Sequence, residues 1–185
     1  MSLQLEITNI IHKIIKNYYY NYLNNHKRLL ISNDELRILV EEYYDNEKDI
    51  LKKQIREQLK NNATNTFDKL SIENMIFEIF SDKEFAINKI VRDIVNYQNN
   101  KLIKTTIEYK NDLGLKVDIN EYGVCISNIL NKSIDQNMIN VGDYIINMNN
   151  QNLLALEHEK QIELLQNLKH NVQNNMLDIH VYKHS

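Results

Sequence analysis

Residues 141–149 read Val-Gly-Asp-Tyr-Ile-Ile-Asn-Met-Asn, a glycine-containing turn followed at once by a short apolar run. Glycine adopts backbone conformations that other residues avoid, and a short apolar run after a turn is typical of a buried strand. Similar runs surround this stretch, together with one helical segment. The runs cover residues 103–109, 115–119, 124–130 and 176–182, and the helical segment covers residues 157–168. Short strands with one or two helices predict a small, partly open β-barrel of α+β type.

The helical segment carries its apolar residues three positions apart. Ile162, Leu165 and Leu168 follow this spacing, which places them on one face of a helix. We expect these three side chains to form the face that is buried against the barrel.

The first half of the chain follows a different period. From Leu3 to Tyr97 apolar residues recur every three or four positions, which predicts an all-α bundle of about four amphipathic helices. The first apolar stripe consists of Ile7, Ile10, Ile11, Ile14, Ile15, Tyr18 and Tyr22. The pattern lapses at residues 97–101, and all three glycines lie beyond that point. The sequence therefore predicts a helical-bundle domain of residues 1–98 and a second domain of residues 102–185.

Two serine–glutamate pairs in this half indicate where helices begin. Ser32 with Glu35, and Ser81 with Glu84, have the spacing of a capping box, in which each side chain bonds to the other residue's backbone N–H. We expect the second helix to begin after Ser32 and the fourth to begin after Ser81. The apolar residues of the helix expected after Ser32 are interrupted at Asp45, where that helix could break.

Composition excludes several classes of function. The 185 residues carry a net charge of −3, and lysine and arginine alternate with acidic residues, so no basic footprint for nucleic acid is present. The single cysteine, Cys125, cannot form an internal disulfide and is best read as a small apolar strand residue. No apolar run reaches the roughly 20 residues that cross a bilayer. We expect a cytoplasmic protein that binds no nucleic acid and does not insert into membranes.

The sequence also lacks the usual signs of an enzyme. It contains no Gly-x-Ser-x-Gly, no His-Glu-x-x-His and no glycine-rich phosphate loop. Its six histidines are scattered, without the spacing of a metal site. We therefore expect no catalytic residues, no cofactor and no bound metal.

A candidate binding loop lies between the first two predicted strands, at Asp112-Leu113-Gly114-Leu115. A glycine between apolar residues at such a position lets successive backbone N–H groups point toward one place, and such a nest binds a carboxylate. Three further segments follow in order: residues 123–130, residues 141–149, and the helix start His-Glu-Lys at residues 158–160. Together these pieces resemble a PDZ domain over roughly residues 102–183, with the strand order of animal-type PDZ domains and its two helices.

The resemblance implies a site for the free C-terminus of another protein. The N–H groups of Leu113, Gly114 and Leu115 would hold the terminal carboxylate, and the ligand would lie as an extra antiparallel strand beside residues 115–119. The pocket for its last side chain would be lined by Leu113, Leu115, Val117, Ile162 and Leu165. His158, at the start of the helix, would accept a hydrogen bond from a Ser or Thr hydroxyl. The implied ligand class is Ser/Thr-x-hydrophobic-COOH.

Two charged residues depart from the family pattern. Asp112 stands where the first loop position is usually glycine, and its carboxylate should repel a ligand carboxylate unless it points to solvent. Lys110 is nearer to the loop than the basic residue that usually precedes it. Apolar residues at Leu115, Val117, Ile162 and Leu165 would also suit any small barrel, so these four residues support the fold more directly than the site.

Two functional hypotheses remain open. The chain is either an adaptor for C-terminal tails, or a structural subunit whose PDZ-like domain packs in a larger assembly without binding a peptide. The helical half could add a second partner or self-association. Its cluster Tyr18-Tyr19-Tyr20 and Tyr22 cannot face one core with every ring, so some rings lie at a rim or at a partner interface.

Overall fold

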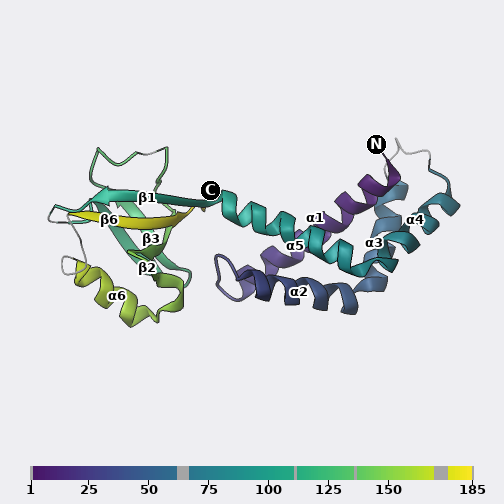
Figure 1. Ribbon diagram of the computed structural model, residues 1–185, viewed down its shortest axis with the longest axis horizontal. Coiled ribbons are helices and arrows are strands. Elements are labelled where there is room, and N and C mark those ends of the chain that lie inside the picture. The colour runs from purple at the N-terminus through teal and green to yellow at the C-terminus, as the bar shows by residue number, and fades with distance from the viewer. Residues whose placement is uncertain (1, 62–66, 111, 136, 169–174, 185) are drawn as a thin grey trace. The chain divides into compact units, whose positions relative to one another are not determined.

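The computed structural model describes residues 2–61, 67–110, 112–135, 137–168 and 175–184. The chain divides into two compact units, Met1–Tyr97 and Gln98–Ser185. Over the described residues, the first is helical and the second is a sheet with one α-helix (Figure 1). The helices are α1 (Leu3–Asn25), α2 (Asn33–Asn46), α3 (Lys48–Asn61), α4 (Lys69–Ser81) and α5 (Lys83–Asn100). The described residues thus contain five helices before the sheet, because the second predicted helix breaks after Asn46.

Helix α1 supplies the central apolar row of the helical unit. Its buried side chains include Leu3, Ile7, Ile11, Ile15, Tyr19 and Leu23, spaced four apart, and it packs on α2, α3 and α4. Residues four apart lie one above the other on a helix face. Of the expected stripe, Ile7, Ile10, Ile11 and Ile15 are buried, and Ile14, Tyr18 and Tyr22 are partly buried against the same core. Tyr19 and Leu23, which the stripe did not include, are buried as well.

The remaining tyrosines of α1 lie around the edge of this core. The ring of Tyr18 is 4.4 Å from that of Tyr43, the ring of Tyr20 is 5.8 Å from that of Tyr97, and Tyr22 stacks on His26 at 4.1 Å. Each ring therefore has an aromatic neighbour within the helical unit. This arrangement favours the rim interpretation of the tyrosine cluster.

One of the two predicted capping boxes is confirmed. Ser32 Oγ accepts the Glu35 N–H at 3.2 Å, and Glu35 Oε2 accepts the Ser32 N–H at 3.0 Å. The prediction for Ser81 is wrong, because the side chain of the next residue, Asp82, accepts the Phe85 N–H at 3.1 Å. The hydroxyl of Ser81 instead donates to the Phe77 carbonyl at 2.7 Å. The cap lies one residue later than the sequence pattern indicates.

The second unit is one open antiparallel sheet. Its strands are β1 (Leu102–Glu108), β2 (Leu115–Asn120), β3 (Gly123–Ile129), β4 (Tyr144–Met148), β5 (Gln151–Asn152) and β6 (Met176–Tyr182). The order across the sheet is β1-β6-β4-β3-β2, with β5 paired to β4. The 3₁₀ helix η1 (Leu153–Ala155) and helix α6 (His158–Gln166) join β5 to β6. The predicted α+β fold with a partly open barrel is confirmed.

The turn that opens β4 is built around a buried charge. Gly142 has a φ of +93°, and Asp143 is only 1 % exposed. The Asp143 carboxylate accepts hydrogen bonds from the Asn140 N–H at 2.8 Å, the Lys183 ammonium at 2.7 Å and the His184 N–H at 3.2 Å. A buried charge is tolerated when it is paired and hydrogen-bonded in this way. Asp143 therefore ties this turn to the end of β6.

None of the helices within the described residues is both long enough and apolar enough to cross a membrane.

Candidate functional site

The predicted carboxylate loop has a backbone that only glycine fits at its centre. Gly114 has a φ of +67°, and its carbonyl accepts the N–H groups of Leu130 at 2.9 Å and Asn131 at 3.0 Å. A Cβ at residue 114 would lie 2.7 Å from the Cβ of Asn131. The loop is therefore fixed against the end of β3, and β2 begins at the next residue.

One edge of β2 is open beside this loop. Among the described residues, β2 pairs with β3 and with no other strand. The Gly114 carbonyl accepts the Leu130 N–H, so residue 114 faces β3. In an antiparallel pair, residues that face the partner strand alternate with residues that face away. The N–H of Leu115, the next residue, therefore points away from β3 toward the open edge. This edge offers backbone hydrogen-bonding groups to an added strand.

The side chains of the predicted pocket come from the loop, from β2 and from α6. Leu113 and Leu115 are each 7 % exposed in the core, and Val117 is half-buried against the same core. Helix α6 lies beside β2 (Figure 1). Ile162 is 38 % exposed and Leu165 is half-buried. Leu113 and Leu115 thus belong to one apolar cluster against which Val117 and Leu165 pack, whereas Ile162 is exposed.

Helix α6 buries a different face from the predicted one. Within the helix the buried residues are Gln161 and Leu164 rather than Ile162 and Leu165. Leu168, just beyond the helix, is buried as predicted. The Gln161 amide can be buried because it donates to the carbonyls of Leu153 at 2.8 Å and Leu156 at 3.3 Å. Ile162 is exposed and Leu165 is half-buried against the core, and both lie on the helix face that also carries the exposed His158.

The carboxylate of Asp112 does not simply point to solvent. Its Oδ1 atom accepts the Gly114 N–H at 2.8 Å, so it is bonded to one of the three backbone groups predicted to hold a ligand. Aspartate commonly bonds to the N–H two residues on, and the spacing Asp-Leu-Gly was the signal in the sequence. Repulsion of a ligand carboxylate was expected from the sequence, but this bond was not. Lys110, in turn, pairs with Glu108 at 3.3 Å.

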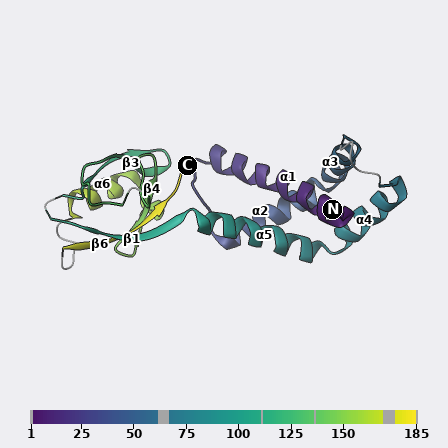
Figure 2. The ribbon, with the colours of Figure 1, turned by 90° about the horizontal axis from the view of Figure 1, so that it is seen from above.

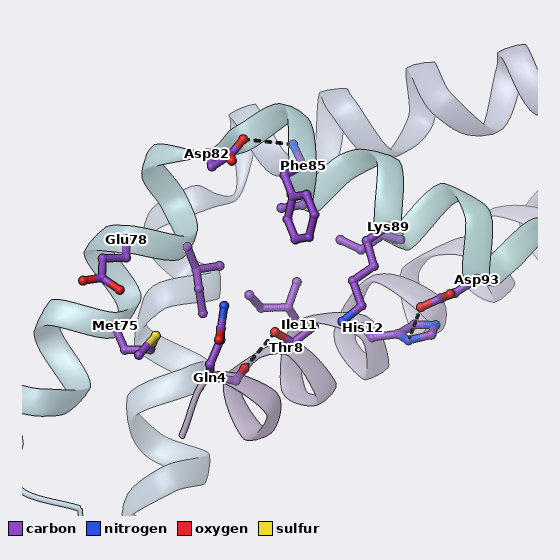
Figure 3. A pocket seen from close by; sticks show the side chains of 13 residues that line it. Gln4, Thr8, Ile11, His12, Met75, Glu78, Asp82, Phe85, Lys89 and Asp93 are labelled. Carbon is purple, nitrogen blue, oxygen red and sulfur yellow. Dashed lines mark hydrogen bonds and ion pairs between the residues drawn. The ribbon is translucent and has the colours of Figure 1, made fainter. Parts of the chain in front are cut away.

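A separate pocket of about 280 Å³ lies in the helical unit (Figure 3). It is formed by α1, α4 and α5, and α1 and α5 lie side by side there (Figure 2). Ile11, Met75, Ile79, Ala86 and Ile90 give it an apolar lining. Several polar side chains at its edge bond within the unit: His12 lies 3.6 Å from Asp93, and Thr8 donates to the Gln4 carbonyl at 2.7 Å. No residue predicted to bind a ligand lies here.

Within the described residues, no group of three or more His, Cys, Asp or Glu side chains could hold a metal ion.

Comparison with known proteins identifies the second unit. Residues 102–175 match the family model of the PDZ domain. The chain therefore contains a PDZ domain in its C-terminal unit, and the match does not extend to the helical unit. PDZ domains are protein-interaction modules and typically lack catalytic activity, so this part of the chain is of the interaction class.

Solved structures with a similar fold include domains of InaD. The fifth PDZ domain of InaD is 19 % identical, and the match covers 45 % of this chain and 98 % of that one, with a TM-score of 0.37. The third PDZ domain of InaD in complex with a TRP channel tail is 18 % identical, covering 49 % and 94 %, with a TM-score of 0.37. The PDZ45 segment of InaD in complex with NORPA CC-PBM is 21 % identical, covering 44 % and 42 %, with a TM-score of 0.35. No curated protein matches the chain.

Proposed function

We propose that the chain is a non-enzymatic adaptor whose PDZ domain holds the free C-terminus of a partner protein. The observation that carries this proposal is the open edge of β2, which begins at the Leu113-Gly114-Leu115 loop and runs beside α6. A C-terminal segment would add to β2 as an antiparallel strand, and its carboxylate would reach the N–H groups of the loop.

The adjacent face of α6 supplies selectivity in this proposal. Main-chain pairing does not distinguish side chains, so discrimination depends on the pocket and on His158. A hydrophobic last residue would contact Val117, Ile162 and Leu165, the last two of which α6 leaves outside its buried face. A Ser or Thr hydroxyl two residues earlier would donate to the exposed imidazole of His158. The favoured ligand class is Ser/Thr-x-hydrophobic-COOH.

The test is a binding screen of the purified chain against a library of peptides with free C-termini, followed by polarisation titrations of the best binders. Each binder is compared with the same peptide carrying an amidated terminus. We expect the free form to bind more tightly, because amidation removes the charge that a backbone nest holds. Equal affinity of the two forms would refute the assigned site.

The role of His158 is tested separately, with His158→Ala. A neutral hydrogen bond contributes about 0.5 to 1.5 kcal/mol, so affinity for Thr-containing peptides should fall roughly three- to tenfold. A peptide with Val in place of Thr is the matched control and should bind both proteins equally. An unchanged preference for Thr in the variant would refute the ligand class but leave the carboxylate site standing.

A further inference from the structure

The proposed carboxylate site already holds a carboxylate of its own chain. The Gly114 N–H donates to Asp112 Oδ1 at 2.8 Å, within the usual range for a strong hydrogen bond. Among the described residues, no other hydrogen bond or ion pair of the Asp112 side chain is present. The residue itself is exposed, whereas Gly114 is buried.

The backbone of Gly114 is held in place by the segment that follows β3. Its carbonyl accepts the N–H groups of Leu130 and Asn131, just after β3, and a Cβ at residue 114 would lie only 2.7 Å from the Cβ of Asn131. The N–H direction is therefore set by the fold. An incoming carboxylate can use this group only if the Asp112 side chain leaves it.

Two carboxylates at one N–H group are also electrostatically unfavourable. Like charges a few ångströms apart repel each other, and the repulsion is stronger in a partly buried site than in water. Since Asp112 is exposed, its side chain can rotate into solvent, where its charge is hydrated. Ligand binding would thus exchange one carboxylate for another instead of filling an empty nest.

We propose that Asp112 is a built-in competitor that weakens the binding of free C-termini and reduces the advantage of a free over an amidated terminus. This inference rests on the function proposed above. As a consequence, the terminal carboxylate of the partner contributes less to the binding free energy than it would in a loop without Asp112. Strand pairing and the side-chain pocket must then contribute a larger share, which favours partners with an extended segment before the terminus.

The test uses the full chain and a labelled decapeptide that ends in Thr-Gln-Val with a free carboxylate, together with its amidated form. Asp112→Ala removes both the charge and the acceptor, and should tighten binding of the free peptide about tenfold, equal to about 1.4 kcal/mol. The amidated peptide should change far less. Asp112→Asn keeps an acceptor oxygen without the charge, and should give an intermediate gain.

Asp135→Ala is the matched control. Asp135 Oδ1 accepts the Asn137 N–H at 2.8 Å, the same bond across the same spacing, and the substitution removes the same charge. Its partner N–H is not part of the carboxylate loop, so binding should not change. A general effect of net charge would tighten binding in this variant as well, and would overturn the inference.

The opposite role for Asp112 is that its bond organises the loop for the ligand. In that case Asp112→Ala would weaken binding of the free peptide, and this result would overturn the inference. If Asp112→Ala fails to fold, as judged by its amide NMR spectrum, Asp112→Asn decides: unchanged or weaker binding of the free peptide overturns the inference. If the unaltered chain prefers the free peptide and neither variant binds it more tightly, only the inference fails. If the unaltered chain and both Asp112 variants bind the free and amidated peptides equally, or bind neither, both the inference and the proposed function fail.

Discussion

The helical unit and the PDZ domain are stabilised in different ways. In the helical unit, apolar side chains from all five helices form one continuous cluster, and partly exposed ion pairs such as Arg56–Glu73 at 2.7 Å link the helices. The PDZ domain has an apolar core too, but its turns depend on particular residues. Gly114 has no room for a side chain, and the buried Asp143 carboxylate accepts three hydrogen bonds.

This difference explains why only one unit resembles a known family. A core of apolar residues accepts many substitutions of similar volume, so the helical unit leaves a periodic pattern but no motif in its sequence. A glycine with positive φ or a buried carboxylate accepts almost none. Gly114 and Asp143 are residues of this kind, and both lie in the segments that carry the resemblance.

The largest expected effect comes from Asp143→Asn, which keeps the shape of the side chain and removes its charge. Breaking a buried ion pair by removing one partner typically costs about 3 to 5 kcal/mol, and here the Lys183 ammonium, whose side chain is 16 % exposed, loses the carboxylate 2.7 Å away. The free energy of unfolding is measured by urea titration, followed through amide NMR signals of each unit. Only the PDZ signals should shift to lower urea.

Leu36→Met is the corresponding change in the helical unit. Leu36 is fully buried, and a swap that conserves volume should cost less than about 1.5 kcal/mol. Asp118→Asn, on the exposed face of β2, should change stability by less than about 0.5 kcal/mol. If the transitions of both units move together in Asp143→Asn, the proposed independence of residues 1–98 and 102–185 is wrong.

The second prediction compares two glycines of the PDZ domain. A Cβ at residue 142 would have no atom within 4 Å. Gly142→Ala should therefore lower the free energy of unfolding only by the cost of a left-handed backbone, about 1 to 2 kcal/mol. Gly114 also has a positive φ, and there the new Cβ would in addition clash with Asn131. Gly114→Ala should therefore lower the free energy of unfolding by about 2 kcal/mol or more. Urea titration of the PDZ signals measures both. Equal costs would show that the loop can move away from β3, and would weaken the case for a fixed nest.

Much of the fold could be predicted from sequence because its signals are local. The change from a helical to an alternating period marks the passage from helices to strands, and the Ser32 capping box marks the start of α2. The failures are errors of one residue. Ser81 and Asp82 are both good caps, and only the tertiary course of the chain determines that Asp82 takes the role.

The candidate site could be predicted only in part, for a similar reason. Hydrophobicity assigned Ile162 to the core and overlooked Gln161, because the two carbonyls that satisfy the Gln161 amide come from the segment before α6. The spacing of Asp112 and Gly114 allows the bond between them but does not determine it. Whether that side chain would bond to the loop or extend into water depends on the loop conformation, which the sequence does not specify.

The third prediction concerns the end of α1, where the helical unit uses a residue other than glycine in a left-handed conformation. Lys27 has a φ of +52°, and the N–H groups of Lys27 and Arg28 bond to the carbonyls of Asn24 and Leu23, which is a Schellman motif. Lys27→Gly should stabilise this unit by about 0.5 to 1 kcal/mol. Lys27→Ala controls for the lost charge and should bring no gain. A loss of stability in the glycine variant would show that the lysine side chain matters more than its backbone.

The last prediction sets one buried tyrosine of each unit against the other. Tyr144 in the PDZ domain accepts a hydrogen bond from Asn120 Nδ2 at 3.1 Å, so Tyr144→Phe should cost about 0.5 to 1.5 kcal/mol. Tyr44 in the helical unit is 1 % exposed and stacks on Phe80. No partner for its hydroxyl is present among the described residues. Tyr44→Phe keeps the stacked ring and removes an unsatisfied group, so at pH 7 it should leave stability unchanged or raise it by up to about 1 kcal/mol.

Alkaline pH should widen the difference between Tyr44→Phe and the unaltered chain. Burial, together with the nearby charges of Asp45 and Asp82, raises the pKa of Tyr44 to about 12, whereas an unfolded tyrosine ionises near 10. Between these values the unfolded state loses its proton first, so the free energy of unfolding falls by about 1.4 kcal/mol for each pH unit. Tyr44→Phe lacks this loss, so relative to its difference at pH 7 its advantage should not grow below pH 10 and should increase by about 1.4 kcal/mol at pH 11. Urea titrations at pH 7 and pH 11 measure it, and a cost above about 1 kcal/mol at pH 7 would show that the hydroxyl is bonded after all.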